Sequence, residues 1–205
     1  MRALRHAGAQ ATQSTTSQHV HIGVNGWTAR QIANFARIWY KQEELILKAV
    51  GTLERRLARY TRPTDRGFIE RLEKAKPTTK EELNMAWFGC YKPQPAHYDS
   101  ARYRAINLNN VWRTGTVEIR AFNGTTHAGE VKAHIILCLA IAAKAYLAKC
   151  ASTKNQREFN EATARYDFRV FLLHLDLNGA EFKNTRMHLL KLLNGNSSWK
   201  NGRPE

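Results

Sequence analysis

Long apolar segments are missing from this sequence of 205 residues. No run reaches the roughly 18 apolar residues that a membrane-spanning helix needs, so we expect no membrane partner. The N-terminal stretch also lacks the continuous apolar core of about 7 to 15 residues that marks a secretory signal. It is basic and rich in Ser, Thr and Gln, and we interpret residues 1–17 as a polar tail or a truncated start.

Cysteine is scarce, and Cys90, Cys138 and Cys150 match no zinc-binding spacing. If Cys138 and Cys150 share a helix, its rise of about 1.5 Å per residue separates them by about 18 Å, too far for a disulfide. The sequence therefore predicts a protein of the reducing cytoplasm.

Acidic residues are absent before Glu43, and the whole chain has a formal net charge of +15 at pH 7. This charge favours either a polyanionic partner such as nucleic acid or simply a basic, solvated surface. No block of five or six like charges decides between these readings. A P-loop of the form G-x-x-x-x-G-K is also absent, which excludes that way of holding nucleotide phosphates.

Length and hydrophobic periodicity predict a single α+β domain. Thr28 and Gln31 have the spacing of a capping box at the start of an amphipathic helix. The segment 129–149 is apolar nearly all round, which predicts a fully buried helix. The predicted helices are 28–50, about 65–76, a helix capped by Thr78 and Glu81, 129–149, and two more through 168–175 and 187–193.

Strands are predicted in the stretch RYRAINLNNVWRTGTVEIRAFNGTT, with a turn at Thr114 and Gly115. Together with the strand-like stretch HVHIGV, it predicts a mostly antiparallel sheet. We expect the helices to pack on one face of this sheet and polar side chains to lie on the other.

His19 and His21 are two apart in HVHIGV. On a strand such side chains point to the same face, so the imidazoles would lie side by side while Val20 and Ile22 face the core. That arrangement suits contact with a metal ion or with phosphate. Two solvent-facing histidines on an edge strand are the alternative.

Two further same-face pairs occur on the predicted hairpin. Glu118 and Arg120 alternate with apolar residues, where a charge is costly unless it is paired or binds a metal. A mutual salt bridge is the alternative. Arg102 and Arg104 form the third pair, and their alternative is a basic edge that opposes strand pairing. Three polar pairs on three predicted strands indicate the floor of one site.

These segments resemble a known family. HVHIGV, then ARYRAINLNN, then GTVEIRAFNGTT leading into a long apolar helix, is similar to the amidoligases of the carboxylate–amine ligase superfamily, which includes glutamine synthetase and glutamate–cysteine ligase. The resemblance spans about Gln18 to Trp199, which implies a single domain over residues 18–199 and a short tail over 200–205. It includes the region around Arg55, Arg56 and Tyr60. It implies a fold like the catalytic domain of glutamine synthetase.

The resemblance implies an ATP-dependent ligase, in which a carboxylate becomes an acyl phosphate that an amine then attacks. Its partners would be a small-molecule or peptide carboxylate and an amine. Mg²⁺ or Mn²⁺ suits a mixed carboxylate and phosphate site better than structural zinc. The implied residues are His19 and Glu118 as metal ligands, His21 near the nucleotide phosphates, Arg104 and Arg120 on the phosphate or acyl phosphate, and Arg102 and Asn107 on the substrate.

One element of the family pattern is missing. Such ligases take further metal ligands from an N-terminal strand of the form E-x-E, whereas no acid precedes Glu43 here. One imidazole and one carboxylate are few ligands for a hard cation. Either upstream sequence is absent, or acids such as Asp99 and Glu130 substitute, or the site is inactive; we favour a truncated N-terminus.

Three hypotheses stay open. The first and favoured one is an amide-forming ligase. The second is a basic nucleic-acid-binding module, whose binding would weaken steeply with salt. The third is a ligase-like remnant without catalysis, whose polar pairs only bridge one another.

Overall fold

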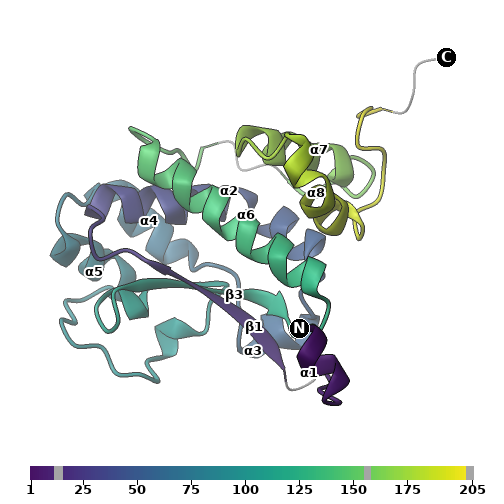
Figure 1. The fold of residues 1–205 in the computed structure, drawn as a ribbon. Coiled ribbons are helices and arrows are strands. Elements are labelled where there is room, and N and C mark those ends of the chain that lie inside the picture. The colour runs from purple at the N-terminus through teal and green to yellow at the C-terminus, as the bar shows by residue number, and fades with distance from the viewer. Residues whose placement is uncertain (12–15, 155–157, 202–205) are drawn as a thin grey trace.

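The computed structural model describes residues 1–11, 16–154 and 158–201. It has the α+β architecture that the sequence predicts, with helices layered over a small antiparallel sheet (Figure 1). The elements are α1 (Arg2–His6), β1 (Ser17–Gly23), α2 (Ala29–Ala49), α3 (Glu54–Arg59), α4 (Arg66–Ala75), α5 (Lys80–Phe88), η1 (Ser100–Arg102), β2 (Ile106–Asn107), η2 (Asn109–Val111), β3 (Thr116–Asn123), α6 (Ala128–Leu147), α7 (Ala164–His174), η3 (Ala180–Phe182) and α8 (Lys183–Leu190).

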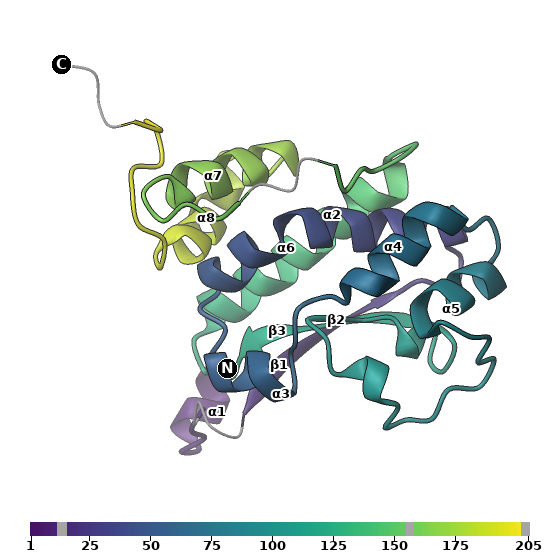
Figure 2. The same ribbon diagram turned by 180° about the vertical axis from the view of Figure 1, so that it is seen from behind.

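The sheet has the order β1-β3-β2, and β3 pairs antiparallel with both neighbours. Helices α2 and α6 lie against its inner face, and α7 and α8 lie beyond them (Figures 1 and 2). The predicted turn before β3 contains Gly115, whose φ is +69°. A Cβ there would lie 1.7 Å from Asn25 Oδ1, so this turn needs glycine for both its conformation and its space.

Two helix caps test the predictions from sequence closely. The capping box of Thr28 and Gln31 at the start of α2 is confirmed. At α5 the prediction is one residue early, because the box is formed by Thr79 and Glu82. Thr78 also donates to the Glu82 carboxylate through its backbone N, over 2.7 Å. Two adjacent threonines before two adjacent glutamates leave the register open in the sequence.

Helix α6 differs from the fully buried helix that its composition predicts. One face, including Leu137 and Ile141, is buried in the core. On another face, Leu139 and Leu147 are 54% and 78% exposed. Composition overestimates burial here because nothing within the described part of the chain covers that face. In the same ranges, none of the helices has the length and hydropathy that crossing a membrane requires.

A buried carboxylate on α2 fixes the loop that approaches the outer face of the sheet. Glu43 Oε1 accepts from Trp39 Nε1 (2.8 Å) and Thr64 Oγ1 (2.6 Å), and Glu43 Oε2 accepts from Thr64 N (2.8 Å). Burial raises the pKa of Glu43, although these hydrogen bonds and the charge of Arg104 act against the rise. The loop between α3 and α4 is therefore held against α2 at Thr64.

Replacing Glu43 by Gln should lower the free energy of unfolding by about 1 to 3 kcal/mol, because the single acceptor oxygen of an amide leaves a buried donor unpaired. Thr64→Val removes only one donor and should cost about 1 kcal/mol. Urea unfolding of the two variants measures both. A Glu43→Gln protein as stable as the parent would contradict this role.

Candidate active site on the outer face of the sheet

Strand β1 presents its two histidines on the outer face of the sheet. Val20 and Ile22 are buried, whereas His19 and His21 are exposed. His21 lies opposite Glu118 of β3, and a register shift interrupts the ladder beside His19. Bulges of this kind redirect side chains. The two-residue spacing thus places both imidazoles as the sequence predicts.

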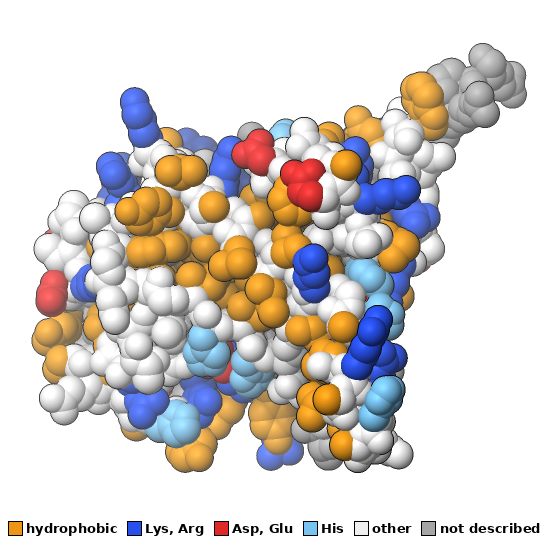
Figure 3. Space-filling model, in the orientation of Figure 1, with side chains coloured by type: hydrophobic (Ala, Val, Ile, Leu, Met, Phe, Trp, Pro, Cys, Tyr) orange, Lys and Arg blue, Asp and Glu red, His pale blue; other side chains and the backbone are white. Residues whose placement is uncertain are grey.

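Glu118 is the centre of the site, and its side chain is only 2% exposed. Its Oε1 lies 2.8 Å from His19 Nδ1 and 2.7 Å from Arg120 Nη1. The same oxygen is 3.8 Å from His21 Nε2. Figure 3 shows histidine side chains beside a small, recessed acidic patch on this face. Three of the residues assigned to metal and phosphate therefore surround one carboxylate oxygen of the fourth.

Two asparagines hold the other oxygen of the carboxylate. Asn107 Nδ2 donates to Glu118 Oε2 over 2.7 Å, and Asn110 Nδ2 donates to it over 3.1 Å. Asn107 lies directly opposite Glu118 in the β2–β3 register. Asn110 was not predicted from the sequence. The available signal was the density of asparagine in NLNN, a polar cluster within a buried stretch.

The electrostatics keep Glu118 ionised. Burial by itself raises the pKa of this carboxyl, but hydrogen bonds from His19 and Asn107 and the charge of Arg120 outweigh it and lower the pKa to about 2. A buried carboxylate with this many donors is an anion at any pH near neutrality. The site therefore has a fixed negative charge flanked by imidazoles.

Arg120 connects the site to the loop after α3. Its Nε donates to Tyr60 O over 3.2 Å, and its Cζ lies 5.8 Å from the centre of the Tyr103 ring. Arg56 Nη2 in turn donates to the backbone O of Arg120 over 2.7 Å. Burial, together with the charge of Arg120, lowers the pKa of Arg56. The arginine and tyrosine region noted in the sequence thus supports the site from behind.

Arg102 and Arg104 do not form the same-face pair that the sequence predicts. Arg102 ends the 3₁₀ turn η1 and is not on a strand. Asp99 initiates that turn, because its Oδ1 accepts from Ala101 N over 2.9 Å. The Cζ of Arg102 lies 5.6 Å from the centre of the Tyr103 ring. Arg102 therefore shares that ring with Arg120 and lies at the edge of the site.

Arg104 lies against the loop between α3 and α4. Its backbone forms an isolated parallel bridge with Arg62. Arg104 Nη1 donates to Pro63 O over 3.0 Å, and Nη2 lies 3.5 Å from Asp65 Oδ1. The first strand of the predicted hairpin is thus reduced to two residues, because the chain first pairs with this loop and only then with β3.

The two acids suggested as substitute metal ligands do not join Glu118. Asp99 Oδ2 lies 2.8 Å from Lys92 Nζ. Glu130, in the first turn of α6, forms an ion pair with Lys191, which follows α8. Within the described ranges, the group around Glu118 that could hold a metal ion consists of His19, His21 and Glu118.

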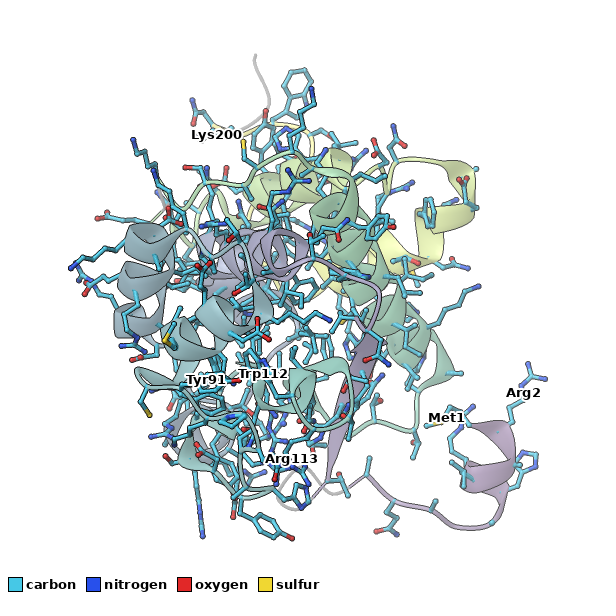
Figure 4. The ribbon with its side chains drawn as sticks, turned by 90° about the vertical axis from the view of Figure 1, so that its left-hand side faces the viewer. Met1, Arg2, Tyr91, Trp112, Arg113 and Lys200 are labelled. Carbon is cyan, nitrogen blue, oxygen red and sulfur yellow. The ribbon has the colours of Figure 1, made fainter. Side chains whose placement is uncertain are left out.

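The site is an open face bordered by loops. Trp112 packs its ring 5.6 Å from that of Phe88 and anchors the end of η2. Arg113 follows it and is exposed; Figure 4 shows both residues at the same end of the molecule as Tyr91.

A cavity of about 520 Å³ lies away from this site, lined by α2, the α4–α5 loop and the residues after α6.

Acid unfolding should report on Glu118. The unfolded chain protonates this carboxyl near pH 4.5 and the folded protein only near pH 2, so the stabilisation is complete above about pH 4.5 and is lost as the pH falls towards 2. The difference amounts to about 3 kcal/mol. Glu118→Gln should be less stable than the parent at pH 7 and should lose less stability over this interval. Parallel curves of unfolding free energy against pH would contradict the assignment.

Comparison with known protein families identifies one family that matches this chain. The model of the family described as "Putative amidoligase enzyme" matches residues 1–142. The matched range includes β1, β2, β3 and most of α6, and therefore every residue assigned to the site. Searches of curated proteins and of solved structures find no match. Because the family model covers well over half of the chain, the protein belongs to the amidoligase family.

Proposed function

We propose that this amidoligase uses ATP to convert a carboxylate into an acyl phosphate and then transfers the acyl group to an amine. The observation that carries the proposal is the buried, ionised Glu118, which two imidazoles and a guanidinium contact or approach on an open face. This arrangement supports phosphoryl chemistry, because such reactions are accelerated mainly by positioning and by charge stabilisation.

The donor set fits a divalent cation. One ligand atom from each of His19, His21 and Glu118 lies within 4.8 Å of the others. Asn107 and Asn110 orient the carboxylate from behind, as outer-sphere groups do in metal sites. We propose Mg²⁺ or Mn²⁺ at this position, which would neutralise phosphate charge when ATP is bound.

The arginines differ in how they could serve the reaction. Arg120 lies beside Glu118 and is the candidate for contact with the transferred phosphoryl group. Arg104 would have to exchange Asp65 for a phosphate oxygen, because its guanidinium now contacts that carboxylate. Arg102 lies at the edge of the site, where it could hold the substrate carboxylate.

The remaining residues have narrower roles. The side chain of His21 is 45% exposed, so it can reach phosphates that approach from solvent. Asn107 was expected to place the substrate. Because it donates to Glu118, we assign it to holding that carboxylate in position.

The proposed reaction has two steps. A carboxylate oxygen of the substrate forms a bond to the γ-phosphorus of ATP, and the bond from that phosphorus to the ADP oxygen breaks. The amine nitrogen then attacks the acyl carbon, the carbon–oxygen bond to phosphate breaks, and the amine loses a proton to solvent. The products are an amide, ADP and inorganic phosphate.

The partners follow from charge and exposure. A net charge of +15 favours anionic substrates, and the open sheet face leaves room for either a small molecule or a peptide that carries the carboxylate. Free Cys90, Cys138 and Cys150 are compatible with the reducing cytoplasm proposed as its location.

The direct test is ADP release from ATP with Mg²⁺ or Mn²⁺ and a pool of amino acids. Release should depend on both a carboxylate and an amine, and Glu118→Gln should reduce it by about 100-fold or more. Glu44→Gln, at an exposed position on α2, is the matched control and should leave the rate unchanged. Circular dichroism checks that both variants fold.

Two outcomes of that experiment would redirect the proposal. Equal ADP release by the parent and Glu118→Gln would contradict it. Absence of turnover, together with salt-sensitive binding of DNA or RNA that does not depend on Glu118, would favour the nucleic-acid-binding alternative.

The two histidines should contribute unequally to cation binding. His19 Nδ1 is 2.8 Å and His21 Nε2 is 3.8 Å from the same Glu118 oxygen. His19→Ala should therefore weaken Mn²⁺ binding by about tenfold relative to the parent. His21→Ala should weaken it less. Electron paramagnetic resonance titration of free Mn²⁺ measures this. A larger loss in His21→Ala would contradict the assignment of His19 as the closer ligand.

A further inference from the structure

A second cluster of metal-ligating side chains lies where α6 begins and α8 ends. His127 is the N-cap of α6, Glu130 is in its first turn, and His188 is in the last turn of α8. One ligand atom from each lies within 4.8 Å of the others, and the two imidazole rings are 4.9 Å apart. We call these three residues the α6–α8 cluster.

Gly129, between His127 and Glu130, leaves space for the His188 ring to approach them. A Cβ on Gly129 would lie only 2.3 Å from His188 Nε2 and 3.0 Å from His127 Cε1. Any side chain at this position would push the His188 ring away. The glycine at this position therefore permits the close approach of the His188 ring to the start of α6.

Neighbouring groups orient the carboxylate. Thr125 Oγ1 donates to Glu130 Oε2 over 2.6 Å and accepts from His127 N over 3.1 Å. Lys191 forms an ion pair with Glu130 Oε1. A positive charge therefore already contacts this carboxylate, and a metal ion would have to take its place.

We propose that the α6–α8 cluster binds a Zn²⁺ ion. Two imidazoles and one carboxylate are a zinc ligand set, and three protein ligands leave the fourth tetrahedral position for water or a bound molecule. At the proposed ligase site, phosphate oxygens of ATP would complete the ligand set and favour Mg²⁺ or Mn²⁺. Without such oxygens, an imidazole-rich set favours zinc over magnesium. A cavity of about 400 Å³, lined in part by Glu130, His188 and Lys191, opens beside the cluster and gives access to that position.

This site is separate from the proposed ligase chemistry. The family match ends at residue 142, inside α6, so His188 and Lys191 belong to the part of the chain beyond it. The ion would fasten this C-terminal part to the start of α6, which follows β3 directly. Its test therefore does not depend on ligase activity.

The test is calorimetric titration of the full chain with Zn²⁺, accompanied by thermal unfolding with and without the ion. The parent should bind Zn²⁺ and unfold at a higher temperature when it is present. Because His19 and His21 could also take zinc, the event assigned to the α6–α8 cluster is the one that persists in His19→Ala. In His188→Ala and Glu130→Gln this event should weaken by about tenfold or more. His174→Ala, on the exposed end of α7, is the matched histidine control and should leave it unchanged.

Two more variants separate a metal site from a simple ion pair. Gly129→Ala should fold, because alanine favours the helix, and should weaken the Zn²⁺ event by displacing His188. Lys191→Ala removes the competing ammonium and should strengthen it. The absence of a Zn²⁺ event in the parent, or an event that none of His188→Ala, Glu130→Gln and Gly129→Ala weakens, would overturn the proposal.

Discussion

A buried carboxylate on β3, the central strand, is the constraint on which the outer face of the sheet depends. Taking Glu118 out of water costs several kcal/mol unless charged and polar groups replace the lost hydration. Arg120 comes from the same strand, His19 from β1, and Asn107 and Asn110 from β2 and the turn after it. Each neighbouring segment must therefore keep its register for the carboxylate to remain ionised.

The contacts that support Glu118 extend from the sheet to the helices. Arg120 donates to the backbone of Tyr60, and Arg56 donates to the backbone of Arg120. The loop that carries Tyr60 is fastened at Thr64 to Glu43, a carboxylate buried on α2. Two buried acids, one in the helices and one in the sheet, thus bracket the same loop. Both carboxylates therefore depend on that loop to supply or support their hydrogen-bond partners.

Much of this arrangement follows from simple periodicity. The two-residue spacing placed His19 and His21, and likewise Glu118 and Arg120, on one face, and the register of β1 and β3 brought the pairs together. The caps of α2 and α5 also follow from local spacing, apart from a shift of one residue. These features depend on neighbours in the sequence, and for this reason they could be predicted.

Other features depend on contacts between distant segments. Arg102 and Arg104 have the two-residue spacing of a strand, but the structure does not place them as a pair on one strand. Asp99 starts a turn that includes Arg102, and Arg62 pairs with the backbone of Arg104. Asn110 reaches Glu118 only because a 3₁₀ turn returns the chain after β2. Composition cannot predict the exposed face of α6, because an apolar sequence does not specify which segments pack against it.

Oxygen transfer tests the central claim most directly, because it follows the bond that the proposed mechanism makes and breaks. The enzyme would be given ATP, an amine and a pool of amino acids labelled with ¹⁸O in their carboxylates, and the released phosphate would be analysed by mass spectrometry. An acyl-phosphate route predicts that one labelled oxygen moves from the carboxylate into each phosphate formed. Phosphate that is released in a carboxylate-dependent reaction but contains no label would contradict the account.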